Sequence, residues 1–124
     1  MPAITINLVP PETDQEALKR LVLDLQAAVS GIPELRLAKD DLTVLFPADI
    51  LAWGAGLELI VLVDGLFKRE ERTPEVLERL WEAIGTLVHD FAKAYVPQCT
   101  KVEVIPSNYD QDRDGFWTKT IAAQ

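Results

Sequence analysis

The sequence has very few of the residues from which metal and disulfide sites are built. It holds one cysteine, Cys99, and one histidine, His89, among 124 residues. A single cysteine excludes an internal disulfide and a cysteine zinc site, and it fits a reducing compartment. The acidic run DQDRDG at 110–115 lacks the glutamate that completes a calcium loop, so we expect a solvated turn there. We therefore expect neither a bound metal nor a cofactor.

Basic residues and long apolar runs are also scarce. Twelve Lys and Arg stand against twenty Asp and Glu, which gives a formal net charge of −8. This charge disfavours nucleic acid and anionic membranes as partners, because both attract positively charged surfaces. The longest apolar stretch, around 57–63, is far too short to cross a bilayer, and no signal peptide is recognisable. We expect a cytoplasmic protein without a nucleic-acid or membrane partner.

Two similar successions of strand and helix fill most of the chain. Apolar and β-branched residues at 3–9 and 42–46 predict strands. Between them, helical periodicity predicts an amphipathic helix over about 14–30. Thr13 followed by Glu16 has the capping-box pattern, which predicts the start of this helix.

The second half of the chain repeats this order. The continuous apolar run at 57–65 predicts a strand that is buried on both faces. Thr73 and Pro74 predict the start of a second amphipathic helix, which keeps its period to Pro97. Alternation over 101–105 predicts a fourth strand, and a mostly polar tail follows it.

The element order is β-α-β-β-α-β, an α+β fold made of two tandem β-α-β units. We expect one domain over 1–124, with a pseudo-repeat of about 1–47 and 57–106 and a tail at 107–124. Both helices can lie on one face of a four-stranded sheet, which leaves the other face apolar and uncovered. Because such a face avoids water, we expect other subunits to cover it. A ferredoxin-like regulatory module shares the element order. We expect the first and third strands to run parallel side by side only in the tandem fold.

Pro2 stands directly before the first predicted strand. A proline weakens a strand least at its first position, so the residue is tolerated there. Methionine is normally removed when the next residue is small, proline included. We therefore expect Met1 to be lost, which would leave a free secondary amine at the end of a strand.

Positive charge gathers at the carboxyl end of the third predicted strand. Lys68, Arg69 and Arg72 lie there, just before the second helix. Ligands of layered α/β folds bind at such strand ends, and cations beside a helix N-terminus suit an anion. The alternative is a solvated loop in which these residues pair with Glu70 and Glu71.

These features together resemble the tautomerase superfamily in its fused, two-unit form. The superfamily includes 4-oxalocrotonate tautomerase, malonate semialdehyde decarboxylase and macrophage migration inhibitory factor. The resemblance rests on Met1 and Pro2 ahead of an apolar strand, on the tandem halves and on the chain length. VLFPADILAWGAG at 44–56 and GFW at 115–117 resemble the inhibitory-factor branch. FKREERTPE at 67–75 resembles an arginine-bearing turn of the decarboxylase.

The resemblance implies a homotrimer that transfers a proton on a small anionic keto–enol acid, which is a tautomerase (isomerase) reaction. Pro2 would be the general base, and Arg69 or Arg72 would bind the carboxylate. An α-amino group ordinarily titrates near 7.7–8.0, and an apolar pocket or nearby cations lower that pKa. A base that titrates near neutral pH suits proton abstraction next to a carbonyl.

Further site residues are implied by the same resemblance. Lys39 lies near the place of a helpful lysine in the inhibitory-factor branch, and Asp40 is its rival by likeness to the decarboxylase. Phe116 and Trp117 would close the substrate pocket.

Two residues on the fourth predicted strand keep a non-enzyme alternative open. Glu103 and Ile105 stand where the inhibitory-factor branch has a tyrosine and an asparagine. Their presence favours a non-catalytic trimeric binding or interaction protein on the same scaffold.

Overall fold

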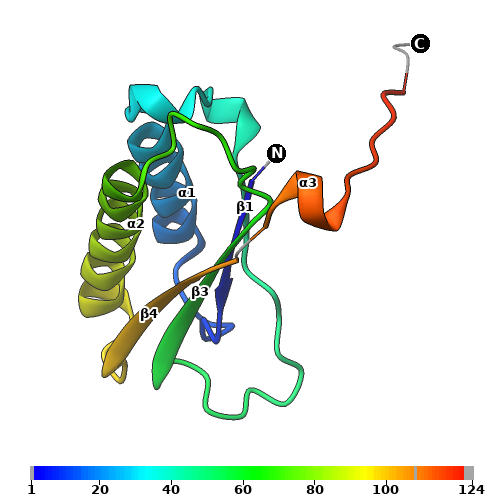
Figure 1. The fold of residues 1–124 in the computed structure, drawn as a ribbon. Helices are drawn as coiled ribbons and strands as arrows, with labels where there is room; N and C mark the ends of the chain where they lie inside the picture. The colour runs from blue at the N-terminus through cyan, green and yellow to red at the C-terminus, as the bar shows by residue number, and fades with distance from the viewer. Residues whose placement is uncertain (1, 108, 122–124) are drawn as a thin grey trace.

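The computed structural model describes residues 2–107 and 109–121. Its elements confirm the α+β class and the β-α-β-β-α-β order (Figure 1). In chain order they are β1 (Ala3–Asn7), α1 (Gln15–Ser30), the 3-10 turns η1 (Pro33–Leu35) and η2 (Lys39–Asp41), β2 (Thr43–Leu45), β3 (Glu58–Asp64), α2 (Pro74–Tyr95), β4 (Lys101–Pro106) and α3 (Gln111–Asp114). None of the helices described has the length and apolar character needed to span a membrane.

The four strands form one sheet in the order β2-β1-β3-β4. β1 is parallel to β2, and β3 is parallel to β4, so each half is a complete β-α-β unit. The expected parallel pairing of the first and third strands is wrong, because β1 and β3 are neighbours but antiparallel. A parallel neighbour needs a crossover such as a helix, and residues 46–57 supply none. β3 therefore starts at the end of the sheet where β2 ends, and it runs antiparallel to β1 and β2.

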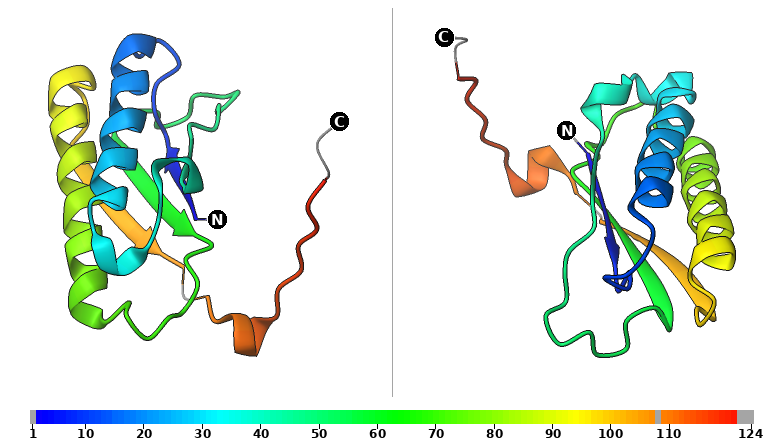
Figure 2. Two further views of the ribbon diagram at one scale, coloured as in Figure 1. Left: turned by 90° about the horizontal axis from the view of Figure 1, so that it is seen from above. Right: turned by 180° about the vertical axis from the view of Figure 1, so that it is seen from behind.

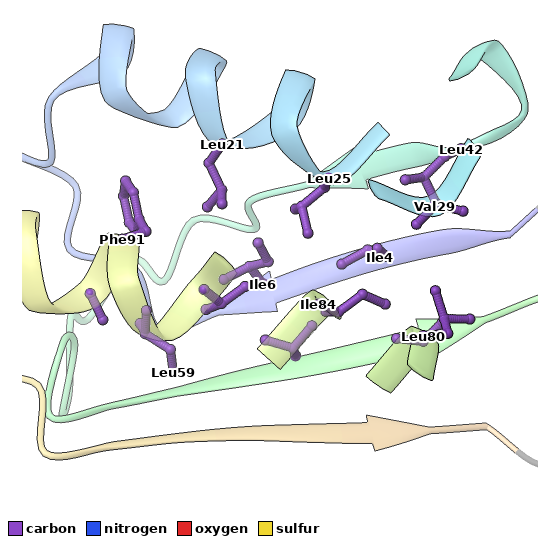
Figure 3. Packing of buried hydrophobic residues seen from close by; sticks show 14 of the residues in the cluster. Ile4, Ile6, Leu21, Leu25, Val29, Leu42, Leu59, Leu80, Ile84 and Phe91 are labelled. Atoms are coloured by element: carbon purple, nitrogen blue, oxygen red, sulfur yellow. The ribbon is translucent and has the colours of Figure 1, made fainter. Parts of the chain in front are cut away.

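Both helices cover the same face of the sheet, as expected (Figure 1 and Figure 2). Their apolar stripes and the inward side chains of the strands form one core. Figure 3 shows the side chains of both helices meeting those of β1 and β3. The labelled members are Ile4, Ile6, Leu21, Leu25, Val29, Leu42, Leu59, Leu80, Ile84 and Phe91.

The sheet face opposite the helices is uncovered in this chain. β3 alternates, with Leu59, Val61 and Val63 buried against the helices and the residues between them only half-buried. The expectation that this strand is buried on both faces is therefore wrong for one subunit. Leu62 pairs with Ile105 on the open face, and Ile105 is 46% exposed. This apolar row is the surface that the sequence predicts other subunits to cover.

The two helix starts differ in how well the sequence predicted them. Thr73 caps α2 as expected, because its hydroxyl accepts a hydrogen bond from the Val76 N–H at 3.3 Å. The capping box at Thr13 is wrong, because Asp14 is the N-cap and its carboxylate accepts from the Glu16 N–H at 3.0 Å. Thr13 is buried, and its hydroxyl donates instead to the Pro10 carbonyl at 2.7 Å. That local bond competes with the capping role.

Candidate functional site

One edge of the sheet gathers the segments that the sequence singled out. β1 begins there, and β3 and β4 end there, because Ala3 pairs with Asp64 and Val63 pairs with Pro106. The loop at 65–73 and the tail therefore both leave the sheet at the edge where the chain enters β1 (Figure 1). Ligand-binding groups in layered folds tend to gather at such loop-bearing edges.

Pro2 is buried at the start of β1. Its carbonyl accepts a hydrogen bond from the Thr43 N–H at 3.2 Å, which ties the residue to the beginning of β2. Because proline has no N–H, the first position of a strand is where it loses least. The residue after Pro2 pairs with Asp64, so the Pro2 backbone lies beside the end of β3.

A cavity of about 490 Å³, here called the aromatic cavity, lies at the end of β3. Phe67 contacts Phe116 edge to face, with ring centroids 4.6 Å apart. Phe67 also contacts Tyr109, with centroids 5.4 Å apart. The residues that line the cavity are Asp64, Gly65, Phe67, Ser107, Tyr109, Phe116 and Thr118.

The sequence named only one of these three aromatic residues. Phe116 lines the cavity, whereas Trp117 is 82% exposed and is not among the lining residues. Phe67 and Tyr109 were missed because they lie in irregular segments, where no periodicity marks an inward side chain. The position of Phe67 next to the basic run was the one available signal.

A second cavity, of about 330 Å³, is here called the arginine cleft. It lies between the η1–η2 segment and the loop before α2. Its lining residues are Arg36, Leu37, Asp41, Arg69 and Arg72. The sequence analysis missed Arg36, which follows η1 in a left-handed backbone conformation with φ of 53°. Three arginines thus converge in a chain whose net charge is −8.

Arg72 is largely occupied by the protein itself. Its Nη1 donates to the Phe67 carbonyl at 2.6 Å, and its Nη2 donates to the Leu35 carbonyl at 2.9 Å. Its Nε is buried without a partner among the described residues. Burial, and then the charge of Arg69, hold the pKa of Arg72 below its usual value. The guanidinium therefore links the loop before α2 to η1.

Arg69 and Lys39 differ from Arg72 because both are exposed. The Arg69 side chain lines the arginine cleft and makes no hydrogen bond or ion pair with a described residue. Lys39 and Asp40 lie on η2, at the same edge of the sheet, and line neither cavity described above. The structure thus brings Arg69 and Arg72 together and leaves Lys39 on the surface nearby.

The acidic run at 110–115 folds as a capped turn around α3. The Asp110 carboxylate accepts from the Asp112 N–H at 3.0 Å, and the Asp114 carboxylate accepts from the Asp110 N–H at 3.1 Å. Among the described residues, no three His, Cys, Asp or Glu side chains are grouped so that they could hold a metal ion.

No protein-family model matches the sequence, and no curated protein matches it either. Solved structures do match. The R7 fused 4-OT wild-type asymmetric trimer has a TM-score of 0.57 at 11% identity, over 84% of this chain and 86% of that one. N1, of the cis-3-chloroacrylic acid dehalogenase family, has 0.56 at 18% identity, over 84% and 75%. FG41 malonate semialdehyde decarboxylase inhibited by 3-bromopropiolate has 0.54 at 18% identity, over 98% and 91%.

At these identities the likeness establishes the fold. The chain shares its fold with these fused 4-OT, dehalogenase-family and decarboxylase structures, and this is the fold that the resemblance predicted. The ferredoxin-like alternative does not fit, because that arrangement splits each β-α-β unit, whereas β1 lies next to β2 and β3 next to β4 here.

Proposed function

We propose that this protein catalyses tautomerase-like proton transfer on a small keto–enol carboxylic acid, with the Pro2 nitrogen as the base once Met1 is removed. The observation that carries the proposal is the position of Pro2. It is buried at the start of β1, next to Ala3, whose pairing partner Asp64 lines the aromatic cavity. Structures with the same fold include tautomerase-superfamily enzymes, which supports this class of reaction.

The reaction needs a base that is held in place and is uncharged near neutral pH. A prolyl amine at a strand end has few rotatable bonds, so little freedom is lost when it meets the substrate. Burial disfavours the protonated form of an amine, and Pro2 is buried. In ketonisation, the amine takes the proton of the enol hydroxyl and returns a proton to the adjacent carbon. The only σ bonds that form and break are bonds to hydrogen, the double bond moves from C=C to C=O, and the amine is regenerated.

Of the two arginines expected to bind the carboxylate, Arg69 is the better candidate. Its guanidinium is exposed and lines the arginine cleft, so all of its donors are available. Arg72 has one N–H of each terminal nitrogen committed to a backbone carbonyl, and its Nε is buried, so fewer of its five donors can reach an anion. In this proposal Arg72 supplies charge and holds the loop, and Arg69 binds the anion.

The active form in this proposal is a homotrimer in which the open sheet faces pack together. Leu62 and Ile105 form an apolar row on that face. Neighbours of the same fold are fused 4-OT trimers, which supports a trimer for this chain. Packing the open faces would remove the row from water.

The test begins with the intact mass of protein from its native host, which we expect to lack Met1. Ketonisation of phenylenolpyruvate is then followed by ultraviolet absorbance for the wild type and Pro2→Ala. The matched control is Ala3→Ser, the next position on the same strand. We expect a large loss of rate in Pro2→Ala only. A retained Met1, or equal rates for Pro2→Ala and the wild type, would remove Pro2 from the chemistry.

A covalent probe gives a second measurement on the same nitrogen. One structure of this fold is Pt0534 inactivated by 2-oxo-3-pentynoate. An amine adds across the triple bond of such a ketoacid without a leaving group, so the adduct has the mass of protein plus reagent. We expect the adduct on the peptide that begins with Pro2. An adduct on a lysine instead would contradict the proposal.

The second candidate function is a non-catalytic trimeric binding protein. Two observations favour it. Arg72 donates to two backbone carbonyls, and β4 carries Glu103 and Ile105 at the positions where the resemblance implies a tyrosine and an asparagine in the inhibitory-factor branch. Acid binding without turnover in a protein that has lost Met1 would select this candidate.

A further inference from the structure

We propose that the tail segment 109–116 is a fixed wall of the aromatic cavity and that Gln111 is the positioning residue that holds it. We further propose that the cavity accepts an aryl or similarly bulky apolar group of a singly charged carboxylic acid. The substrate class rests on the proposed function. The role of Gln111 and the binding preference do not depend on turnover.

Gln111 joins the tail to a loop far away in the sequence. Its Nε2 donates to the Lys68 carbonyl at 3.0 Å, and the Lys68 N–H donates to its Oε1 at 3.1 Å. One side-chain amide thus satisfies both backbone groups of one residue, as a neighbouring strand would. The Lys68 ammonium also lies 3.6 Å from the Asp110 carboxylate. The clamp fixes the loop directly after Phe67.

The segment beyond the clamp is held by its own bonds. The Asp110 and Asp114 carboxylates cap the short helix α3. The Tyr109 hydroxyl donates to the Gly115 carbonyl, which closes the segment on itself. Gly115 has φ of 81°, a left-handed conformation that glycine adopts without strain. The tail therefore reaches the cavity as a built turn with its two aromatic rings in defined places.

The resulting wall is suited to an aromatic ring. Phe67 lies against Tyr109 and Phe116, which come from the tail, and all three line the aromatic cavity. The volume of about 490 Å³ falls within the range of small-molecule sites. Offset and edge-to-face contacts with these rings favour a flat apolar group over a methyl group.

The charge at the cavity selects against a second carboxylate. Asp64 is exposed at the end of β3 and lines the cavity. Its carboxylate repels another anion at this place, whereas the arginine cleft, which lies at the same end of the sheet, offers positive charge. A singly charged acid with an apolar substituent satisfies both surroundings, and a dicarboxylate does not.

Three trans-alkenoic acids that differ only in the terminal group test this preference. Crotonate carries a methyl group, cinnamate a phenyl group and fumarate a second carboxylate. Binding is measured by calorimetry, so catalysis is not required. We expect cinnamate to bind the wild type about ten-fold more tightly than crotonate, with fumarate weakest. Equal binding of cinnamate and crotonate would overturn the proposed ligand class even if Pro2 proves catalytic.

Variants separate the wall from the clamp. Phe116→Ala removes part of the wall and should weaken cinnamate binding with little change for crotonate. Asp64→Asn should strengthen fumarate binding and leave cinnamate nearly unchanged. Failure of either change would contradict the assignment of the cavity.

Gln111→Ala tests the positioning role, with Gln98→Ala as the matched control at the other end of the sheet. We expect Gln111→Ala alone to reduce the cinnamate preference and to speed hydrogen exchange at the Lys68 amide about ten-fold or more, because that amide loses its acceptor. Gln111→Glu keeps the acceptor and should restore most of the amide protection. Unchanged exchange and unchanged preference in Gln111→Ala would overturn the role of the clamp.

Discussion

Arg72→Met should lower the free energy of unfolding, whatever its effect on substrate binding. The guanidinium donates to the Phe67 and Leu35 carbonyls, and each bond from a charged donor contributes about 1.5–3 kcal/mol. Against this stands the cost of the buried, unpartnered Nε, about 1–3 kcal/mol. The difference predicts a net loss of about 2–3 kcal/mol for Arg72→Met.

Urea unfolding at a fixed protein concentration measures this loss. With a slope of about 1–2 kcal/mol per molar, the midpoint should fall by about 1–3 M, and the slope should not change. The matched control is Arg69→Met, which removes the same charge from an exposed side chain. We expect the control to change stability by less than about 0.5 kcal/mol. Arg72→Lys keeps the positive charge, but its compact ammonium lacks the fork that reaches both carbonyls, so its midpoint should lie between those of Arg72→Met and Arg69→Met.

The outcome also separates the two arginines in function. Arg69→Met should weaken acid binding while its unfolding midpoint stays near that of the wild type. Equal midpoints for Arg72→Met and Arg69→Met would refute the reasoning, because the link between the loop and η1 would then contribute nothing measurable.

Three further predictions concern other parts of the chain. Gly56→Ala should lower the free energy of unfolding by about 2–3 kcal/mol, because φ is +80° and the new Cβ would lie 2.7 Å from a proline ring carbon. Gly54→Ala should lower it by only about 1 kcal/mol, because φ is +72° but the surroundings are open. The hydrogen bond from the Arg113 side chain lowers the pKa of Asp114 to about 2. At pH values above 3.8, the ordinary pKa of the group, the ionised carboxylate therefore stabilises the tail, and this effect is lost as the pH falls toward 2. A carboxyl resonance of Asp114 that titrates at 3.8 would contradict the pair. Leu62→Lys should reduce the mass measured by light scattering to that of a monomer with unchanged circular dichroism, and a monomeric wild type would contradict the trimer.

The helices were predictable because their signals are local. Apolar residues at helical spacing define the stripe of α2, and Thr73 with Pro74 marks its first turn. At α1 the same kind of local signal predicted the helix but not its N-cap residue. Thr13 and Asp14 are both good caps, and the choice between them depends on a bond to the Pro10 carbonyl that the sequence does not reveal.

The strand directions and the site walls were harder to predict because they depend on distant segments. Whether β1 and β3 run parallel is decided by the path of residues 46–57, which have no periodicity. From the sequence, Arg72 could not be told from a ligand-binding cation, because its hydrogen-bond partners are the backbone carbonyls of Phe67 and Leu35. Every residue has a backbone carbonyl, so no residue type marks this pairing. The clamp by Gln111 was invisible for the same reason, since its partner is the backbone of Lys68.

The two β-α-β halves of the fold resemble each other, but only the first half has a residue suited to the proposed chemistry directly before its first strand. Pro2 precedes β1 and is buried, whereas the equivalent residue before β3 is Leu57, which is 56% exposed. The nitrogen of Leu57 is an amide within the chain and has no basic lone pair to offer. In the proposed mechanism each chain therefore supplies one base for two β-α-β units. The aromatic cavity, the arginine cleft and the clamped tail all lie at the edge that holds Pro2, and that asymmetry is what the proposed function requires.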